Sequence, residues 1–237
     1  MAEWKAKRFW TEETIVEVEG GFEIQLDGRV LKTPAKTSLT VPTRALADLI
    51  KGEWATQEGE IDPLSMPFTR LANAAVDKVA VQFDEVAEIV AAYGGTDLLC
   101  YRATYPEGLI ARQAEKWDPL LDWAKTRFGV ALATGQGVMH VAQNPDETAK
   151  LTARVKSETA FGLAALHELV AMSGSLILGL AAAEGQNSVA AIWDLSRVDE
   201  TWQIQEWGED EDAAKMVEIK RIEFETIARF YHSLQVA

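Results

Sequence analysis

The stretch TIVEVEGGFEIQLDGRVLKT, residues 14–33, decides the fold class of this 237-residue chain. Apolar and polar side chains alternate on both sides of a Gly-Gly pair, and this two-residue repeat is typical of half-buried strands. Asp27-Gly28 is a dipeptide that accepts positive φ angles in a tight turn, so residues 29–33 are predicted to return as a third strand. Residues 38–41 are expected to add a short fourth strand. One face of the hairpin should be buried, through Val16, Val18, Phe22, Ile24 and Leu26.

Helical periodicity replaces this alternation in the rest of the chain. A first helix is expected after Pro42-Thr43, with an apolar stripe of Leu46, Leu49, Ile50 and Trp54. From about residue 67 nearly every apolar residue recurs at helical spacing. The sequence therefore predicts an α+β protein, with a small β-rich N-terminal domain over residues 1–80 and an all-helical C-terminal domain over residues 81–237.

Three parts of the helical region carry specific expectations. Asp118-Pro119 is expected to kink or restart its helix, because proline has no amide hydrogen to donate. Residues 169–183 form an uncharged apolar run that is shorter than the roughly 20 residues needed to span a bilayer, so they are predicted to be a buried core helix. Residues 188–207 and 209–234 are each predicted to form one further helix.

Charge and cysteine content exclude several classes of partner. Lys and Arg number 23 and Asp and Glu 37, which gives a net charge of −14 that repels nucleic acid and anionic lipid. We therefore expect neither a nucleic-acid partner nor membrane insertion. The single cysteine, Cys100, cannot form an internal disulfide, and the N-terminal MAEWKAKRFW lacks the apolar core of a secretory signal. Both features predict a cytoplasmic protein, or a protein of the mitochondrial matrix in a eukaryote.

Common catalytic and cofactor motifs are absent from the sequence. His167-Glu168 supplies only half of a zinc-binding HExxH motif, because Ala171 stands where the second histidine belongs. Neither GxxxxGK[ST] nor GxGxxG occurs, so no phosphate-binding loop is predicted, and no GxSxG frames a nucleophilic serine. Aliphatic neighbours are expected to make Cys100 buried and inert. The sequence thus predicts no metal, no cofactor and no enzymatic activity.

The strongest local signal is an acidic segment near the C-terminus. Residues 194–212 hold eight acidic side chains against the single Arg197, together with Trp202 and Trp207. The acids of residues 209–212 have a simple explanation, since the first turn of a helix favours negative charge. That explanation does not account for the other acids or for the tryptophans. Aromatic residues with a polar rim are typical of docking surfaces, so the segment is a candidate partner site.

Six short strings, taken together and in order, resemble one protein family. They are GFEIQLDGRVLKTPAK (21–36), EW (53–54), MPFTRLAN (66–73), TDLLCYRA (96–103), WDPLLDWA (117–124) and DETWQIQEWGEDEDA (199–213). The set resembles the assembly chaperones of mitochondrial-type F1-ATPase that handle its alpha subunit, and the likeness runs from about Trp10 to the C-terminus. That family also has a β-rich domain followed by a helical one.

The resemblance implies a function and a binding site. It implies a protein that holds the newly made alpha subunit, prevents its aggregation and releases it when a beta subunit takes its place. The contact would be made by the residues that match the C-terminal motif of the family, which are Trp202, Gln203, Glu206 and Trp207. Glu200 would support them. The resemblance implies no small-molecule substrate.

Two other functions fit the sequence. One is a small-molecule enzyme that uses paired acid–base groups, either Glu200 with Glu206 or His167 with Glu168, in a cleft between the two domains. The other is a general holdase, which would bind many unfolded proteins without a preference for the alpha subunit.

Overall fold

The chain folds into two compact units. The computed structural model describes residues 7–235, so the first six residues of the N-terminus discussed above lie outside it. One unit comprises Met1–Phe83, Thr159–Ala165 and Arg229–Ala237, and the other comprises Asp84–Glu158 and Leu166–Ala228. The predicted division at residue 80 stays a prediction. The α+β fold class, with strands near the N-terminus and helices after them, is confirmed.

A four-stranded sheet forms from the stretch that predicted it. Strands β1 (Glu13–Val18) and β2 (Gly21–Leu26) pair as an antiparallel hairpin. Both β3 (Arg29–Val30) and β4 (Thr40–Val41) then pair antiparallel with β2, so the third and fourth strands are present but shorter than expected.

The buried face of the hairpin differs from the prediction in its first strand. Ile15 lies opposite the fully buried Ile24, so it is Ile15 that shares the inner face, while Val16 is 37% exposed. Val18 lies two residues further on the same face as Val16, so the prediction was wrong for both, because alternation reports two faces without saying which one is inside. Gly21 follows the turn with a φ of 148°, and a Cβ there would collide with the carbonyl of Val41.

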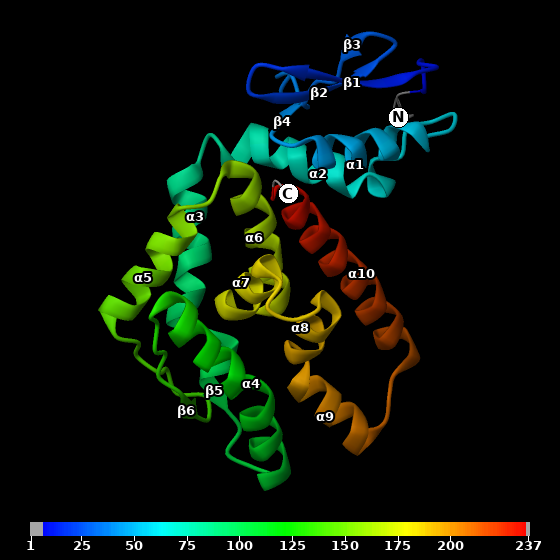
Figure 1. Cartoon of the computed structure of the whole chain (residues 1–237). Coiled ribbons are helices and arrows are strands. Elements are labelled where there is room, and N and C mark those ends of the chain that lie inside the picture. The colour runs from blue at the N-terminus through cyan, green and yellow to red at the C-terminus, as the bar shows by residue number, and fades with distance from the viewer. Residues whose placement is uncertain (1–6, 236–237) are drawn as a thin grey trace. The chain divides into compact units, whose positions relative to one another are not determined.

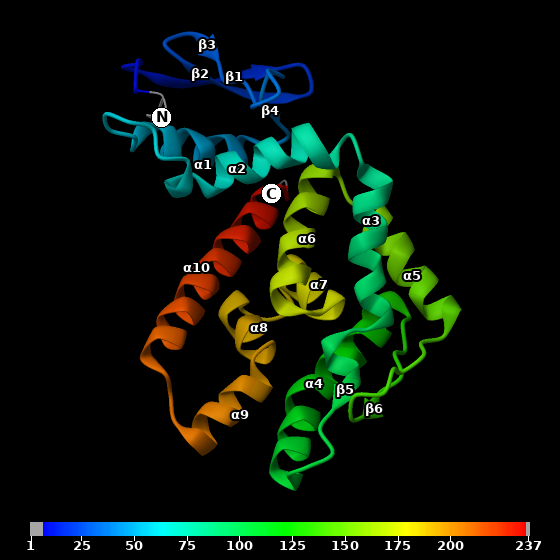
Figure 2. The same ribbon diagram turned by 180° about the vertical axis from the view of Figure 1, so that it is seen from behind.

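Helices α1 (Arg44–Ala55) and α2 (Pro67–Ala74) lie together on one side of the sheet, as Figures 1 and 2 both show. Thr43 caps α1 by accepting a hydrogen bond from the Leu46 amide at 3.2 Å. Leu46 and Ile50 are buried as predicted, whereas Trp54 is only half-buried, with its ring edge-on to that of Trp10 at 5.1 Å. The short turns η1 (Pro63–Ser65) and η2 (Ala75–Val79) flank α2.

A buried carboxylate, which the sequence did not reveal, joins these two helices. Glu53 of α1 accepts hydrogen bonds from the amides of Phe68 and Thr69, at 2.6 and 2.7 Å, and from the Thr69 hydroxyl at 2.6 Å. These amides belong to the first turn of α2, which has no side-chain cap of its own. Glu53 therefore caps α2 from a neighbouring helix, and its burial raises its pKa.

Helices and short connecting elements make up the remainder of the chain. In both views α3 runs beside α5 (Figures 1 and 2). Within residues 7–235, no helix combines the length and the apolarity needed to cross a membrane. The elements are α3 (Phe83–Ala92), η3 (Tyr93–Gly95), η4 (Leu98–Cys100), β5 (Tyr101–Arg102), α4 (Glu107–Phe128), β6 (Gly135–Gln136), α5 (Pro145–Lys156), α6 (Ala160–Ser173), α7 (Leu176–Glu184), α8 (Val189–Leu195), α9 (Val198–Trp207) and α10 (Glu211–Ser233).

Two predicted helices are each broken in two. Residues 169–183 belong to α6 and α7, because Gly174 adopts a φ of 70° and the Ser175 hydroxyl caps α7 by accepting from the Leu178 amide at 3.0 Å. Residues 188–207 belong to α8 and α9, which are separated at Ser196 and Arg197. In both cases the apolar periodicity continues across the break, so periodicity alone did not show it.

The converse holds in α4, which runs unbroken through Pro119, so the helix does not restart there. A proline inside a helix leaves the carbonyl four residues earlier without its usual partner. Here that carbonyl belongs to Glu115, which is exposed, so water can take the place of the missing amide. On either side of Pro119 the helix keeps its inward face, with Trp117 and Leu120 buried.

Asp97 anchors the core of the second unit. Its carboxylate is fully buried and accepts from the Ser175 hydroxyl at 2.7 Å, the Ile177 amide at 3.0 Å and the Leu99 amide at 3.0 Å. Burial raises the pKa of Asp97 above 3.8. The neighbouring Cys100 is also buried, and the loss of hydration, together with the nearby charge of Asp97, raises the pKa of its thiol to about 12.

Candidate partner-binding site

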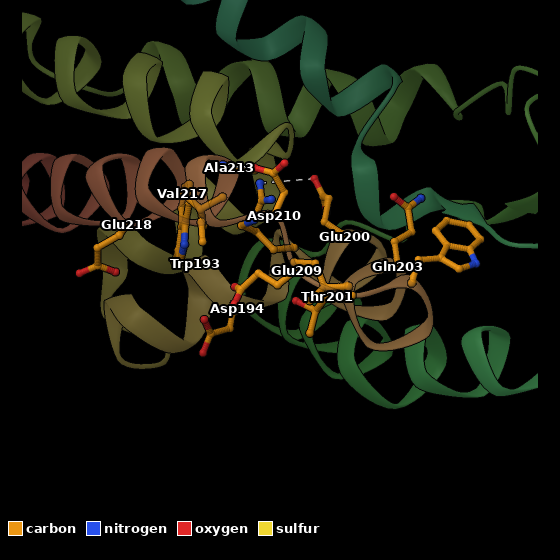
Figure 3. Close-up of a pocket in the computed structure, with 15 residues that line it drawn as sticks. Trp193, Asp194, Glu200, Thr201, Gln203, Glu209, Asp210, Ala213, Val217 and Glu218 are labelled. Carbon is orange, nitrogen blue, oxygen red and sulfur yellow. Dashed lines mark hydrogen bonds and ion pairs between the residues drawn. The ribbon is translucent and has the colours of Figure 1, made fainter.

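A surface hollow lies where α9 ends and α10 begins, inside the second unit. Its volume is about 530 Å³, and all its lining residues come from α8, α9, α10 and the turns that join them. Figure 3 shows Gln203 and Glu218 at opposite ends of this hollow. The lining residues are Trp193, Asp194, Arg197, Glu200, Thr201, Gln203, Ile204, Trp207, Gly208, Glu209, Asp210, Ala213, Ala214, Val217 and Glu218.

The turn between α9 and α10 has a clear local cause. Gly208 ends α9 with a φ of 92°, a conformation that other residues rarely adopt. Asp210 then caps α10, its carboxylate accepting from the amides of Asp212 at 3.0 Å and Ala213 at 2.8 Å. Glu211 and Asp212 occupy the first turn of α10, so the helix-start explanation is confirmed for Asp210, Glu211 and Asp212, whereas Glu209 precedes the cap.

The floor of the hollow is apolar. Trp193 is buried, and its ring lies 5.5 Å from that of Phe224 on α10. Ile204 from α9 and Val217 from α10 continue the apolar surface, with Ile204 39% exposed. An exposed apolar floor favours contact with another apolar surface.

The rim of the hollow is acidic. Five lining residues are carboxylates, and Arg197 is the one cation among them. Arg197 pairs with Glu200, Nη1 to Oε1, at 3.4 Å. Within residues 7–235, the side chains of Asp194 and Glu209 take part in no hydrogen bond or ion pair, so their charge faces solvent. The hollow as a whole therefore favours a cationic partner.

Three of the five residues implied by the resemblance meet at this hollow. Glu200, Gln203 and Trp207 follow one another on α9 at spacings of three and four residues, which places them on one helical face. Trp207 is 81% exposed, and no ring or hydrogen-bond partner holds it within the described chain.

The other two residues lie elsewhere on α9. Trp202 is half-buried against α4, where its ring stands under the guanidinium of Arg112 at 4.7 Å and would collide with a Cβ at Gly108. Arg112 also donates to Gln205 at 2.7 Å. Glu206 is exposed but does not line the hollow. Trp202 therefore holds α9 against α4, and its role in partner binding stays a prediction.

Sequence reasoning missed the residues that α8 and α10 contribute. Trp193 and Val217 form the floor, and they lie more than twenty residues apart in the chain. The available signal was the Gly208 turn, which folds α10 back beside α8 and α9. Reading residues 188–207 as a single helix hid this arrangement, because Arg197 then appeared inside a helix and not at a break.

The acid–base pairs of the alternative enzyme hypothesis are not assembled as that hypothesis requires. Glu200 lines the hollow and pairs with Arg197, while Glu206 lies outside its lining. His167 and Glu168 do contact each other, Nδ1 to Oε1, at 3.1 Å, and this hydrogen bond raises the pKa of His167. Both side chains are more than a third exposed. Among the described residues, no group of three or more His, Cys, Asp or Glu side chains is placed to hold a metal ion.

Comparison with known proteins gives consistent matches. The model of a family described as "ATP12 chaperone protein" matches residues 7–125. The crystal structure of Atp12 from Paracoccus denitrificans is 48% identical, covering 98% of this chain and 100% of that one, with a TM-score of 0.95. A charge-reversal mutant of the same protein superposes equally well, with a TM-score of 0.95 at 47% identity over 99% of this chain and 100% of that one. The mitochondrial protein atp12 of Schizosaccharomyces pombe is 26% identical over 87% of this chain and 75% of its own length.

Proposed function

Because the chain belongs to the ATP12 chaperone family, which assists assembly of the F1 part of ATP synthase, we propose that it binds the unassembled alpha subunit. In this proposal it keeps the alpha subunit from aggregating until a beta subunit displaces it. The place of action is the cytoplasm.

The physical basis is the surface that assembly will later bury. An isolated alpha subunit exposes the area meant for the beta subunit, and large exposed apolar areas cause aggregation. A chaperone that covers this area with moderate affinity blocks aggregation. The beta subunit then displaces it by binding more tightly, so no ATP needs to be hydrolysed. This agrees with the absence of phosphate-binding motifs from the sequence.

The observation that carries this proposal is the exposed Trp207 beside the acid-rimmed hollow. Exposed aromatic side chains dominate the energy of many interfaces, and a polar rim adds specificity. We assign the contact to the face of α9 that bears Glu200, Gln203 and Trp207. Glu206 contributes charge beside it, and Trp202 supports the face by holding α9 on α4.

Separately expressed alpha and beta subunits test the proposal. The full chain should co-purify with the alpha subunit alone and should lower the light scattering of that subunit on dilution from denaturant. Adding the beta subunit should then release it. Equal capture of both subunits, or of unrelated unfolded proteins, would favour a general holdase, and failure to capture the alpha subunit would refute the proposal.

A further inference from the structure

A cationic side chain of the protein itself already occupies the hollow. The guanidinium of Arg197 lies 5.8 Å from the centre of the Trp193 ring, and its Nη1 atom lies 3.4 Å from Glu200 Oε1. Three quarters of the Arg197 side chain is shielded from solvent. The hollow thus holds a guanidinium between an aromatic surface and a carboxylate, which is the surrounding that arginine favours.

The remaining charge of the hollow exceeds what this one arginine neutralises. Four more carboxylates line it. Glu218 pairs with Arg221, and Asp210 accepts hydrogen bonds at the start of α10. The side chains of Asp194 and Glu209 have no partner within residues 7–235. A second cation would therefore find both unpaired charge and an apolar floor along which its aliphatic stem could lie. The charge also argues against other occupants. A second copy of this chain, with a net charge of −14, and any anionic surface would both be repelled.

From this geometry we propose that the hollow receives an arginine or lysine side chain of the alpha subunit, and that Arg197 competes with it for Glu200 and Trp193. The proposal rests on the function proposed above and adds the chemistry of the contact. Arg197 then weakens binding to the alpha subunit and keeps the complex easy to displace. The unusual consequence is that removing this one charge should strengthen the complex.

Affinity measurements with matched variants test the competition. Arg197→Gln keeps a polar side chain at the break between α8 and α9, and its backbone hydrogen bonds do not depend on the guanidinium. Lys215→Gln changes the net charge equally, but Lys215 pairs with Asp212 outside the lining of the hollow. We expect Arg197→Gln to bind the alpha subunit about two- to fivefold more tightly, because an ion pair at the protein surface is worth about that factor. Glu200→Gln should bind the alpha subunit more weakly by a similar factor, and Lys215→Gln should bind it as tightly as wild type.

These variants have clear opposing outcomes. If Arg197→Gln and Lys215→Gln change the affinity equally, only net charge matters and the competition is refuted. If Arg197→Gln binds more weakly, Arg197 itself contacts the alpha subunit and the proposal is wrong. Near-ultraviolet circular dichroism of each variant shows whether its tertiary structure is intact.

A small probe tests the hollow without the alpha subunit. N-acetylarginine amide and N-acetylcitrulline amide differ in charge but hardly in shape. Titrating each into wild-type protein, while the indole N–H signals of Trp193 and Trp207 are followed by NMR, should show saturable shifts with the arginine compound alone. The shifts should appear at lower concentration in Arg197→Gln. Equal responses to both compounds would overturn the proposed preference for a cation.

The two experiments separate the two proposals. If the protein prefers the arginine probe but does not bind the alpha subunit, the proposed function is refuted and the cation preference of the hollow still holds. Binding of the alpha subunit that is unaffected by Arg197→Gln and Glu200→Gln, with no response to the probe, would refute the further inference alone.

Discussion

Two acidic regions of the second unit use the same kind of side chain in opposite ways. At Asp97 a single carboxylate is sealed in the core, and every hydrogen bond it accepts comes from the serine and backbone amides around it. In the hollow between α9 and α10, several carboxylates stand at the surface, and Asp194 and Glu209 have no partner within residues 7–235. Carboxylates buried with partners determine the fold, whereas carboxylates left exposed without partners are available to another molecule.

The largest expected contrast is in chemical reactivity. Cys100 lies beside Asp97 with a thiol pKa of about 12, so the fraction present as thiolate, and with it the rate of thiol exchange, should be about a thousandfold lower than for an ordinary cysteine. Thiol-exchange kinetics with a chromogenic disulfide measure this directly, because the chain has one cysteine. In a Cys100→Ala background, Thr201→Cys places a thiol in the hollow, and it should react at close to the rate of a free thiol.

The contrast fails if native Cys100 reacts quickly. In urea the same thiol should react at the ordinary rate, which verifies that the slow reaction comes from the fold. A fast native reaction would mean that this core opens readily and is not sealed.

A smaller but substantial effect is expected on stability. Asp97→Ala leaves the Ile177 and Leu99 amides without their acceptor in the core, and we expect it to lower the free energy of unfolding by about 3 kcal/mol. Asp84→Ala is the matched control, since the Asp84 side chain is exposed, and it should change stability by less than about 0.5 kcal/mol. Urea unfolding curves of both variants give the comparison. Equal stabilities would show that Asp97 does not anchor the core.

The pH dependence of stability sharpens the same test. Because burial raises the pKa of Asp97, the folded state binds this proton more tightly than the unfolded state does. The stability that this proton contributes is fully present below the pKa of Asp97 in the unfolded chain, near 3.8. It is lost as pH rises through the higher pKa of Asp97 in the folded chain. The free energy of unfolding of wild type, relative to Asp97→Asn, should therefore fall as pH rises. A relative rise would show that the hydrogen bonds outweigh burial and lower the pKa.

The smallest expected changes in stability distinguish the two tryptophans of α9. Trp202→Ala removes a ring packed on Gly108 and Arg112 and should cost about 2 kcal/mol of stability. Trp207→Ala should change stability by less than about 0.5 kcal/mol, since its ring is exposed. The same Trp207→Ala variant should bind the alpha subunit about tenfold more weakly, as loss of an interface anchor does.

Thermal melts and binding titrations of both variants decide between the two assignments. If Trp207→Ala loses stability while Trp202→Ala loses only binding, the roles assigned to the two tryptophans are reversed. Unchanged binding in both variants would move the partner site away from α9.

Local rules predicted the parts of this molecule that depend on neighbouring residues. The hairpin follows from alternation and from Asp27-Gly28, and the α10 start follows from its first-turn acids. Gly174 and Ser175 also carried a local signal, a helix-ending glycine followed by a capping serine. The continuous apolar pattern around them concealed it.

Contacts between distant segments could not be predicted in this way. Glu53 is buried because Phe68 and Thr69 need an acceptor, and nothing near Glu53 in the sequence reveals that need. Asp97 is buried because Ser175 and Ile177 lie against it. The acidic segment was recognisable from composition, but the hollow depends on Trp193 and Val217 meeting across a turn.

Every residue that lines the hollow falls between Trp193 and Glu218, so one short length of chain builds the whole surface. A surface of this kind can change its composition without altering the sheet, the core around Asp97 or the pairing of distant helices. Residues at its rim can thus be changed, in evolution or by design, independently of the residues that maintain the fold. Transplanting residues 193–218 between relatives, with Gly108, Arg112, Gln113 and Trp117 kept as their partners on α4, would test whether this surface carries the partner preference proposed above.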